Sequence, residues 1–336
     1  MTFHFFDFLL LTFDLLCRMK IGLDMMGGDF APLEAMKGVS IYLSENADPA
    51  HIIMIGDQVK LRELADQHRI DPSSYTIVHA DQVIDMHEHP TKALKEKPNS
   101  SISIGFHLLA TGKTDAFISA GNTGAMMVGS LFIIKAIEGV LRPTIGAYMP
   151  RENGQMGWLV DVGINADCKP ENLLQFGILG SLFVKYVWNI ENPRVALLNL
   201  GEEEGKGNIL TQATYPLLKN CADINFVGNI EGRDIFLDKS DVIVCEGFTG
   251  NVILKLAESI YDITQRRNIK DEYFDKFHFE QYGGVPVLGV SKPVIIGHGI
   301  SEGPAFTNMI RMAEKMISTG LLEKIRESFV QQNDAE

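Results

Sequence analysis

The hydrophobic residues of this chain follow two alternating patterns from Met19 onward. Short apolar runs, typical of buried strands, alternate with longer runs whose apolar residues recur with the helical period. The predicted strands are Ile21–Asp24, His51–Ile55, Thr76–His79, Asp115–Ser119, Thr144–Met149, Gly157–Asp161, Arg194–Leu200, Ile224–Gly228, Val242–Cys245 and Val294–Gly297. The predicted helices include Pro32–Ser44, Ser101–Gly112, Pro170–Trp188, Asn208–Lys219 and Asn251–Arg267.

This alternation predicts an α/β fold in three layers, with a mostly parallel sheet covered by helices on both faces. At 336 residues the chain is long enough for one large α/β unit or two closely packed ones. We expect a single domain over residues 19–330, followed by a polar tail over residues 331–336. In such a fold, ligands bind outside the carboxyl ends of the strands.

The first eighteen residues do not fit this alternation. Met1–Cys17 is apolar but is interrupted by Asp7 and Asp14, and it is shorter than the roughly 20 residues of a membrane-spanning helix. It lacks the basic start and the cleavage site of a signal peptide. We interpret residues 1–18 as an extension that is not native to the domain, with Met19 as the initiator. The alternative is an amphipathic helix that touches a membrane.

Glycine-rich polar loops follow several of the predicted strands. They are the segments 24–29, 119–124, 161–167, 198–208, 246–251 and 297–301. One loop of this kind is weak evidence, because glycine is common in turns. Together, their mixture of Gly with Asn, Ser, Thr and His predicts one large polar cleft at a single edge of the sheet.

The loop after the fourth predicted strand has the residues of an anion-binding site. Gly121 and Gly124 allow the backbone to approach a ligand closely. Ser119, Asn122 and Thr123 add side-chain donors beside the first N–H groups of the following helix. The alternative is an ordinary capped helix start, since Asn and Thr are common N-cap residues.

Charge and residue content narrow the function. The formal net charge of −13 argues against nucleic acid as a partner, because phosphate backbones bind clustered cations. The four cysteines have no C-x-x-C spacing, which is typical of reduced residues. His87 and His89 lack a further partner at metal-ligand spacing, so we expect no metal. We expect no cofactor either, and the first strand is not followed by the G-x-G-x-x-G of dinucleotide sites.

Two further motifs resemble catalytic sequences but fail in detail. Gly201–Gly207 is one residue shorter than a P-loop, and it ends in Gly where Ser or Thr would bind magnesium. Gly299–Gly303 matches the G-x-S-x-G motif of serine hydrolases. However, no histidine follows His298, as the residue order of that triad requires. We therefore exclude both activities.

Six motifs occur in order along the chain. They are Met19–Pro32, Ser119–Ala125, Asp161–Asp167, Lys206–Asn208, Gly247–Val252, and Tyr282–Gly284 with Gly297–Gly299. Together they resemble those of the bacterial acyl-carrier-protein:phosphate acyltransferases. The resemblance implies a homodimeric α/β/α enzyme, similar in fold to phosphate acetyltransferases and isopropylmalate-type dehydrogenases, that makes acyl phosphate for phospholipid synthesis. The chain departs from the family pattern at Glu246, where Asp is usual, and in the short segment Ile260–Glu280.

The implied reaction is attack of inorganic phosphate on the thioester of an acylated carrier protein. The site must then hold the anion, stabilise the oxyanion and assist the departing thiolate. We expect Lys206 to supply positive charge, Asn251 to donate to the oxyanion, and His298 to act as an acid toward sulfur. The structural alternatives are an exposed loop lysine, a helix N-cap and a histidine that satisfies a turn.

Three further residues complete the predicted site. Asp24 and Asp29 are expected to orient the donors, because a free carboxylate beside phosphate would repel it. Asn165 is assigned to the set that binds substrate, together with the anion loop.

The sequence does not decide which acyl donor the protein uses or which partners it binds. Arg266, Arg267, Lys270 and Lys276 could dock an acidic carrier protein or form a solvated helix end, and acyl-coenzyme A is the alternative donor. A non-catalytic membrane-associated scaffold is another hypothesis, although it would not need so many polar loops. Members of the family that the chain resembles contact the membrane through a helical tip, which here is Ile260–Glu280. We therefore expect a cytoplasmic protein that associates peripherally with membrane and with the downstream acyltransferase.

Overall fold

The computed structural model describes residues 18–278 and 282–333. The predicted extension over residues 1–18 therefore lies outside the described residues, apart from Arg18. The last helix runs to Asn333, so the first part of the predicted polar tail is helical.

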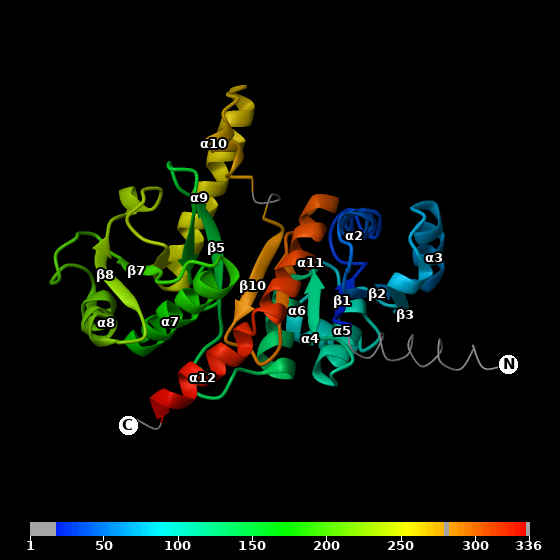
Figure 1. The fold of residues 1–336 in the computed structure, drawn as a ribbon, viewed down its shortest axis with the longest axis horizontal. Coiled ribbons are helices and arrows are strands. Elements are labelled where there is room, and N and C mark those ends of the chain that lie inside the picture. Colours follow the sequence, from blue (N-terminus) through cyan, green and yellow to red (C-terminus); the bar gives the residue numbers. More distant parts are fainter. Residues whose placement is uncertain (1–17, 279–281, 334–336) are drawn as a thin grey trace.

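One sheet of eleven strands runs through the molecule (Figure 1). Its strands are β1 (Lys20–Asp24), β2 (His51–Gly56), β3 (Tyr75–His79), β4 (Ala116–Ser119), β5 (Thr144–Pro150), β6 (Met156–Val160), β7 (Arg194–Leu198), β8 (Asn225–Ile230), β9 (Val242–Val244), β10 (Gly284–Leu288) and β11 (Val294–Gly297). Their spatial order is β3-β2-β1-β4-β11-β10-β5-β6-β9-β7-β8. Every predicted strand is present. The hydrophobic pattern missed β10, because its short sequence carries a Gly and a Pro.

The direction of the strands reverses in the middle of the sheet. Strand β10 pairs antiparallel with both β5 and β11, and β5 pairs antiparallel with β6. All other neighbours pair in parallel. The sheet is therefore mostly parallel, as predicted. Because three antiparallel pairings separate the two parallel groups, however, β6 to β9 run opposite to β1 to β4 and β11.

This reversal corrects the expectation of one polar cleft at a single edge. The loops after β1, β4 and β11 lie at one edge of the sheet, whereas the loops after β6, β7 and β9 lie at the other. The predicted polar loops therefore form two groups.

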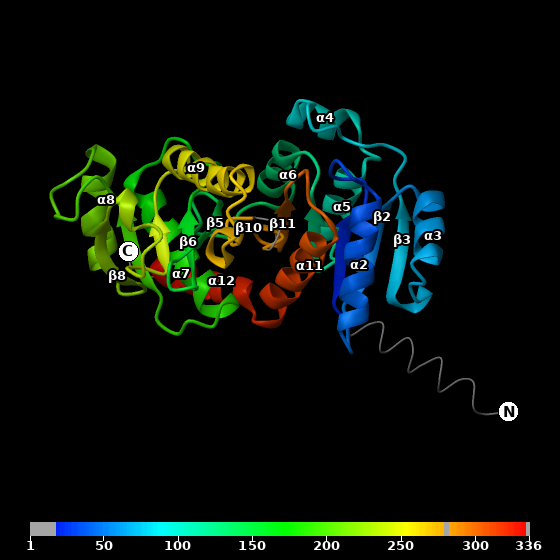
Figure 2. The ribbon, with the colours of Figure 1, turned by 90° about the horizontal axis from the view of Figure 1, so that it is seen from above.

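Helices cover both faces of the sheet, and Figure 2 shows α6 and α9 on one side with α11 and α12 on the other. They are α2 (Leu33–Glu45), α3 (Gln58–Gln67), α4 (Pro90–Glu96), α5 (Ser101–Ala110), α6 (Thr123–Gly129), α7 (Pro170–Val187), α8 (Ile209–Asn220), α9 (Gly247–Arg266), α10 (Glu272–Asp275), α11 (Gly303–Ser318) and α12 (Leu321–Asn333). The predicted three-layer α/β/α architecture is confirmed.

Strand residues alternate between the cores of the two faces. In β2, Ile52 and Met54 belong to one large core with α2, α7, α11 and α12. Ile53 and Ile55 belong to a separate core with α5 and α6. A third core lies under α9. This alternation follows from the two-residue period of a strand, and it requires both faces to be apolar.

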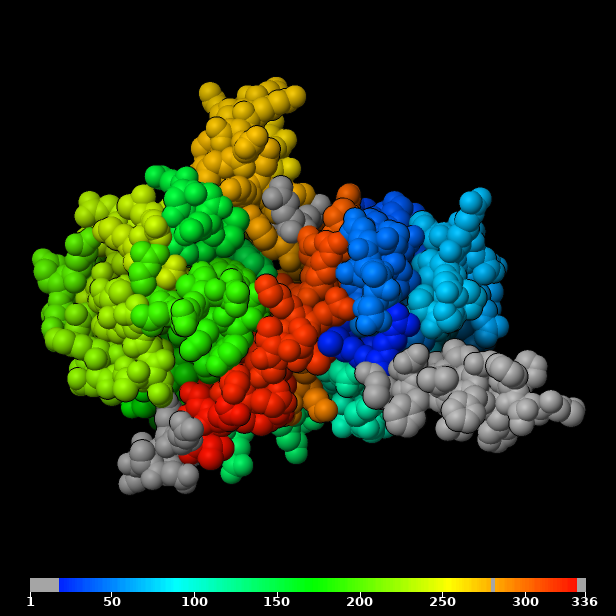
Figure 3. Space-filling view, viewed as in Figure 1, coloured from blue at the N-terminus to red at the C-terminus, as the bar shows by residue number. Residues whose placement is uncertain are grey.

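The end of α9 and the short helix α10 form a projection that we call the tip, residues 260–278 (Figures 1 and 3). Phe277 is buried at its base against Phe236, with ring centroids 5.2 Å apart. Within the described residues, no helix is both long and apolar enough to cross a bilayer.

Candidate active site

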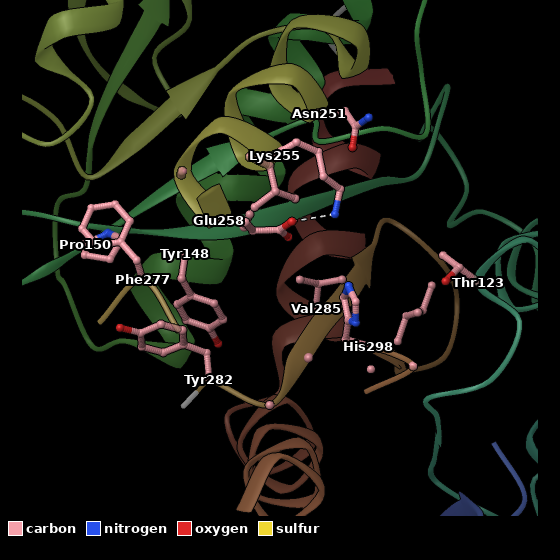
Figure 4. Close-up of a pocket in the computed structure, with 18 of the residues that line it drawn as sticks. Thr123, Tyr148, Pro150, Asn251, Lys255, Glu258, Phe277, Tyr282, Val285 and His298 are labelled. Atoms are coloured by element: carbon pink, nitrogen blue, oxygen red, sulfur yellow. Dashed lines mark hydrogen bonds and ion pairs between the residues drawn. The ribbon is translucent and has the colours of Figure 1, made fainter. Parts of the chain in front are cut away.

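A cavity of about 360 Å³ lies between α9 and the strands β5, β10 and β11 (Figure 4). This volume is within the roughly 300 to 1,000 Å³ of small-molecule sites. Three residues predicted to act on substrate, Thr123, Asn251 and His298, lie in its wall. Helix α9 contributes the largest share of the wall, namely Asn251, Leu254, Lys255, Ala257 and Glu258.

Two glycines let α9 begin directly against the loop that follows β6. A Cβ atom at Gly250 would lie 1.8 Å from the carbonyl oxygen of Asp161. A Cβ atom at Gly247 would lie 2.9 Å from backbone atoms of Asn165, whose carbonyl accepts the Gly247 N–H at 2.8 Å. Any larger residue would push the helix off this loop. The Gly-Phe-Thr-Gly-Asn motif therefore fixes where α9 crosses the sheet.

The N-cap of α9 is Glu246, one turn before the predicted helix start at Asn251. Its carboxylate accepts the N–H of Thr249 at 3.0 Å. Glu246 stands where the family that the chain resembles usually has Asp, and it still provides a carboxylate N-cap. The alternative reading of Asn251 as an N-cap is wrong, because its exposed side chain lies within the helix and lines the cavity.

Asn251, Lys255 and Glu258 form a polar row along the cavity face of α9. Residues three or four positions apart are neighbours on a helix surface. The Lys255 Nζ donates to a Glu258 carboxylate oxygen at 2.7 Å (Figure 4). Lys255 is 57% exposed, so its ammonium stays in contact with water while it lines the cavity.

His298 lies in the turn that follows β11. Ser301 closes this turn, since its Oγ accepts the His298 N–H at 3.2 Å and its own N–H donates to the His298 carbonyl at 2.9 Å. The buried serine of the hydrolase-like motif is thus a turn residue. Partial desolvation by the surrounding cavity wall lowers the pKa of His298 although the residue is exposed, and the Lys255 ammonium lowers it further, against the opposing effect of Glu258 and Asp29. The imidazole is therefore mostly neutral at neutral pH.

Only Thr123 of the predicted anion loop lines the cavity. Asn122 is the N-cap of α6, where its Oδ1 accepts a backbone N–H at 2.9 Å. Its Nδ2 donates to three carbonyls of the 85–88 loop at 2.8 to 3.2 Å. A Cβ atom at Gly124 would lie 2.3 Å from Pro90. For Asn122 and Gly124, the structure therefore shows a capped and closely packed helix start.

Asp24 and Ser119 form a buried network at the ends of β1 and β4. The Ser119 Oγ donates to the Asp24 carboxylate at 2.7 Å and accepts the Gly121 N–H at 2.9 Å. Burial raises the pKa of Asp24. These contacts join the two loops, and none of the three residues lines the cavity.

Asp29 and Asn165 are also held by contacts within the protein. The Asp29 N–H donates to the carbonyl of Gly299, a residue of the cavity wall, at 2.7 Å. The buried Asn165 side chain donates to the Pro143 carbonyl at 2.9 Å and to the Asp161 carboxylate at 2.5 Å. Asp29 therefore supports the cavity, whereas Asn165 supports the start of α9.

Lys206 lies in the exposed loop between β7 and α8, and it is not among the residues that line the cavity. Strands β6 and β9 separate β7 from β5. Gly207 has a φ of +109°, and a Cβ there would lie 2.0 Å from the Thr211 hydroxyl, so the local turn requires this glycine. Within one chain, the structure does not bring Lys206 together with Asn251 and His298.

The cavity has two chemically different ends. Figure 4 separates a polar end, with Thr123, Asn251, Lys255 and His298, from an apolar end, with Tyr148, Pro150, Phe277 and Tyr282. The polar-end residues are exposed, whereas Pro150 and Phe277 are buried. The rings of Tyr148 and Tyr282 stack with centroids 4.6 Å apart. The polar end of the cavity is therefore the more exposed one, and the other end is lined by apolar and aromatic side chains that are buried or partly buried.

Sequence reasoning missed Lys255, Tyr148 and Tyr282. Lys255 had a usable signal, because it follows Asn251 by one helical turn on a predicted helix. Tyr282 belongs to a motif used for the resemblance, but its local sequence indicates no role. Tyr148 is a strand residue that the pattern does not distinguish from a core aromatic.

The chain matches the model of a family described as "Fatty acid synthesis protein" over residues 19–267 and 266–324. It is 40% identical over 332 residues to a phosphate acyltransferase of Dictyoglomus turgidum, covering 92% of this chain and 97% of the relative. It is 41% identical over 330 residues to a phosphate acyltransferase of Aquifex aeolicus, covering 91% and 96%.

Solved structures share the fold at lower sequence identity. A phosphotransacetylase from Streptococcus pyogenes aligns with a TM-score of 0.62 at 18% identity, covering 94% of this chain and 100% of its own. The EutD phosphotransacetylase of Staphylococcus aureus aligns with a TM-score of 0.60 at 18% identity, covering 92% and 98%. The predicted similarity in fold to phosphate acetyltransferases is confirmed, and at this identity the likeness concerns the fold alone.

Proposed function

Because this chain belongs to the phosphate acyltransferase family, we propose that it transfers a fatty acyl group from an acyl carrier protein to inorganic phosphate. Family membership makes the chain an acyltransferase. The carrier-protein donor is the further step of the proposal, as is the use of the acyl phosphate by a downstream acyltransferase for phosphatidic acid and phospholipid synthesis.

The two-ended cavity is the observation that carries this proposal. A charged nucleophile and a thioester suit the polar end, and a hydrocarbon chain suits the apolar end. A fatty chain that covers Pro150 and Phe277 gains about 0.8 kcal/mol for each buried methylene group. An acetyl group is too short to cover most of that apolar surface.

In the proposed reaction, a phosphate oxygen attacks the thioester carbonyl carbon. The new O–C bond forms a tetrahedral oxyanion, the C–S bond then breaks, and sulfur leaves as a thiolate that takes up a proton. Lys255 supplies positive charge for the phosphate and the oxyanion, the role first predicted for Lys206. The amide of Asn251 donates to the oxyanion, and the hydroxyl of Thr123 donates to the phosphate.

His298 assists the leaving group. Its lowered pKa keeps the imidazole mostly neutral at neutral pH, so its unprotonated ring nitrogen can accept a proton from the attacking hydrogen phosphate. The resulting imidazolium then donates this proton to the departing thiolate, and the ring returns to its neutral form.

Positive charge near the cavity supports the carrier protein as donor. Lys276 lines the cavity, and Arg266, Arg267 and Lys270 lie on the same tip of a chain whose net charge is −13. Asp262, Asp271, Glu272 and Asp275 offset these charges, so the tip is neutral as a whole, and an acidic carrier protein would meet less repulsion there than on the rest of this acidic chain. Acyl-coenzyme A remains the alternative donor, since its phosphates would meet the same charges.

We propose a homodimer that pairs α9 with α9 of a second copy. Four apolar residues form an exposed stripe on this helix: Phe248 is 67% exposed, Val252 52%, Leu256 66% and Ile263 45%. They recur at helical spacing beside the polar row, and in a twofold dimer the stripe of one copy would pack against the same stripe of the other. Sedimentation should therefore give a dimer that Leu256→Glu converts to a monomer. A monomeric parent protein would contradict this.

We also propose that the tip contacts anionic membrane from the cytoplasm. The tip stands out from the body (Figure 3) and combines Arg266, Arg267 and Lys270 with aromatic residues. Each interfacial cation contributes on the order of 1 kcal/mol at low salt. A dimer would present two tips and bind more tightly than either alone.

Parallel assays with two donors test the proposed function. The purified protein is incubated with phosphate and either palmitoyl carrier protein or palmitoyl-coenzyme A, and acyl phosphate is measured. We expect kcat/KM to be at least roughly tenfold higher with the carrier protein, because docking energy adds to chain burial. An equal or higher value for the coenzyme A thioester would assign the reaction to that donor.

A further inference from the structure

Aromatic residues from separate segments close the apolar end of the cavity. From this geometry we infer that Tyr148, Phe277 and Tyr282 form an end wall that sets the longest acyl chain the enzyme accepts. This inference rests on the proposed function, because it concerns the acyl group bound in the same cavity. It adds specificity-determining residues that have no part in the chemistry at the polar end.

Tyr148 is the fixed part of the end wall. Its ring stacks on Tyr282 on one side, at an interplanar angle of 21°, and on Trp188 with centroids 5.6 Å apart. The edge of Trp158 meets it at 5.2 Å and 86°. Trp158 is fully buried, so the stack cannot recede without opening the core.

Tyr282 and Phe277 are the parts of the wall that the base of the tip contributes. The Tyr282 hydroxyl donates to the Lys276 carbonyl at 2.7 Å, which ties the ring to the residue before Phe277. The Phe277 ring packs against Tyr273 at 5.4 Å. Both tyrosines are partly buried, but Tyr148 contacts three aromatic rings and Tyr282, within the described residues, contacts that of Tyr148 alone, so the Tyr282 ring can be removed with less damage to the core.

Ala257 supplies a second way to change the depth of the cavity. It is 5% exposed, and it lines the cavity from α9 beside the polar row. A leucine at this position would project into space that the small alanine leaves to the acyl chain. Ser259 lies two residues further on the same helix and does not line the cavity, so it offers a matched control.

These residues allow opposite changes in chain preference. Each methylene group that gains or loses its place in the cavity should change kcat/KM about fourfold, which corresponds to about 0.8 kcal/mol. Removing the Tyr282 ring should favour longer chains. Filling the space beside Ala257 should favour shorter chains.

The experiment measures kcat/KM for a series of acyl donors from octanoyl to stearoyl, with the full-length chain and saturating phosphate. For Tyr282→Ala we expect the ratio of stearoyl to lauroyl activity to rise at least roughly tenfold, and for Ala257→Leu to fall by a similar factor. Tyr282→Phe keeps the ring but loses its hydrogen bond, and Ser259→Leu adds the same leucine outside the cavity. Both should stay within about twofold of the parent ratio.

Unchanged ratios in folded Tyr282→Ala and Ala257→Leu would overturn the inference, and so would equal shifts in Ser259→Leu. If Tyr282→Ala does not fold, the activity ratio of Ala257→Leu alone tests the inference. The KM for phosphate should stay constant throughout, since the wall lies away from the polar end. Failure of the proposed function looks different, because no donor would then give acyl phosphate even with the parent protein.

Discussion

Lys255 and His298 come from distant parts of the chain, yet the Lys255 ammonium lowers the pKa of the His298 imidazole across the polar end of the cavity. Helix α9 carries the lysine, and the turn after β11 carries the histidine. These elements belong to opposite groups of strands, and they meet because α9 crosses the sheet. This pairing is the basis of the proposed catalytic arrangement, in which both groups face the reacting thioester.

Replacing Lys255 with Met should lower kcat at least roughly tenfold, the low end for loss of an electrostatic contact made in the transition state. Methionine keeps the length and the apolar part of the side chain. Lys206→Met is the control, because it removes the same charge from an exposed loop outside the cavity. Steady-state kinetics would instead favour Lys206 if its substitution had the larger effect.

The pKa of His298 should respond to its charged neighbours in opposite directions. Lys255→Met removes a positive charge that opposes protonation, so the His298 pKa should rise toward its ordinary value. Glu258→Gln removes a negative charge that favours protonation, so the pKa should fall further. NMR titration of the imidazole measures both. Shifts with the same sign in both variants would show that the two side chains do not act on His298 directly.

Gly250→Ala should destabilise the protein and displace the start of α9. The added Cβ would lie 1.8 Å from the Asp161 carbonyl oxygen, and overpacking of this kind costs about 1 to 3 kcal/mol. Gly205→Ala is the matched control, because a Cβ there meets no atom within 4 Å. In thermal unfolding, the Tm of Gly250→Ala should be clearly lower than the Tm of the control and of the parent protein. Equal stability of the two variants would mean that α9 does not need this close approach.

The tip should bind vesicles of anionic lipid at low salt and release them at high salt. Charge reversal of Arg266 and Arg267 to Glu should weaken the binding. The same reversal of Lys60 and Arg62 on α3, away from the tip (Figure 1), should have a smaller effect. The assay should give the same result for a chain that begins at Met19. Dependence on residues 1–18 instead would assign the membrane contact to that segment.

Local sequence patterns predicted all the strands of the sheet except β10. They succeeded because buried β-branched runs and helical periodicity depend on residues that are close together in the sequence. The reversal of strand direction was not predictable in this way. It depends on β10, whose Gly284 and Pro286 hide a strand that pairs with two distant partners. The direction of a strand decides at which edge of the sheet its following loop lies. Because β10 was missed, all the polar loops were expected at one edge, in a single cleft.

The residues of the candidate site were likewise predicted only in part. Asn251 and His298 were found because they stand in distinctive motifs, and the structure brings both to one cavity. Asn122 and Asn165 stand in similar motifs, but their amides are used inside the protein. Residue type alone cannot separate a donor that faces a ligand from a donor that holds a loop. Their roles toward substrate, and that of Lys206, stay predictions.

Acyl transfer to inorganic phosphate is the central claim, and isotopically labelled phosphate tests it most directly. The protein is incubated with labelled phosphate and palmitoyl carrier protein in the presence of a chelator, and the products are identified by mass spectrometry. We predict labelled palmitoyl phosphate and free carrier thiol in equal amounts. Release of free palmitate without labelled acyl phosphate, or a requirement for added metal, would contradict the account.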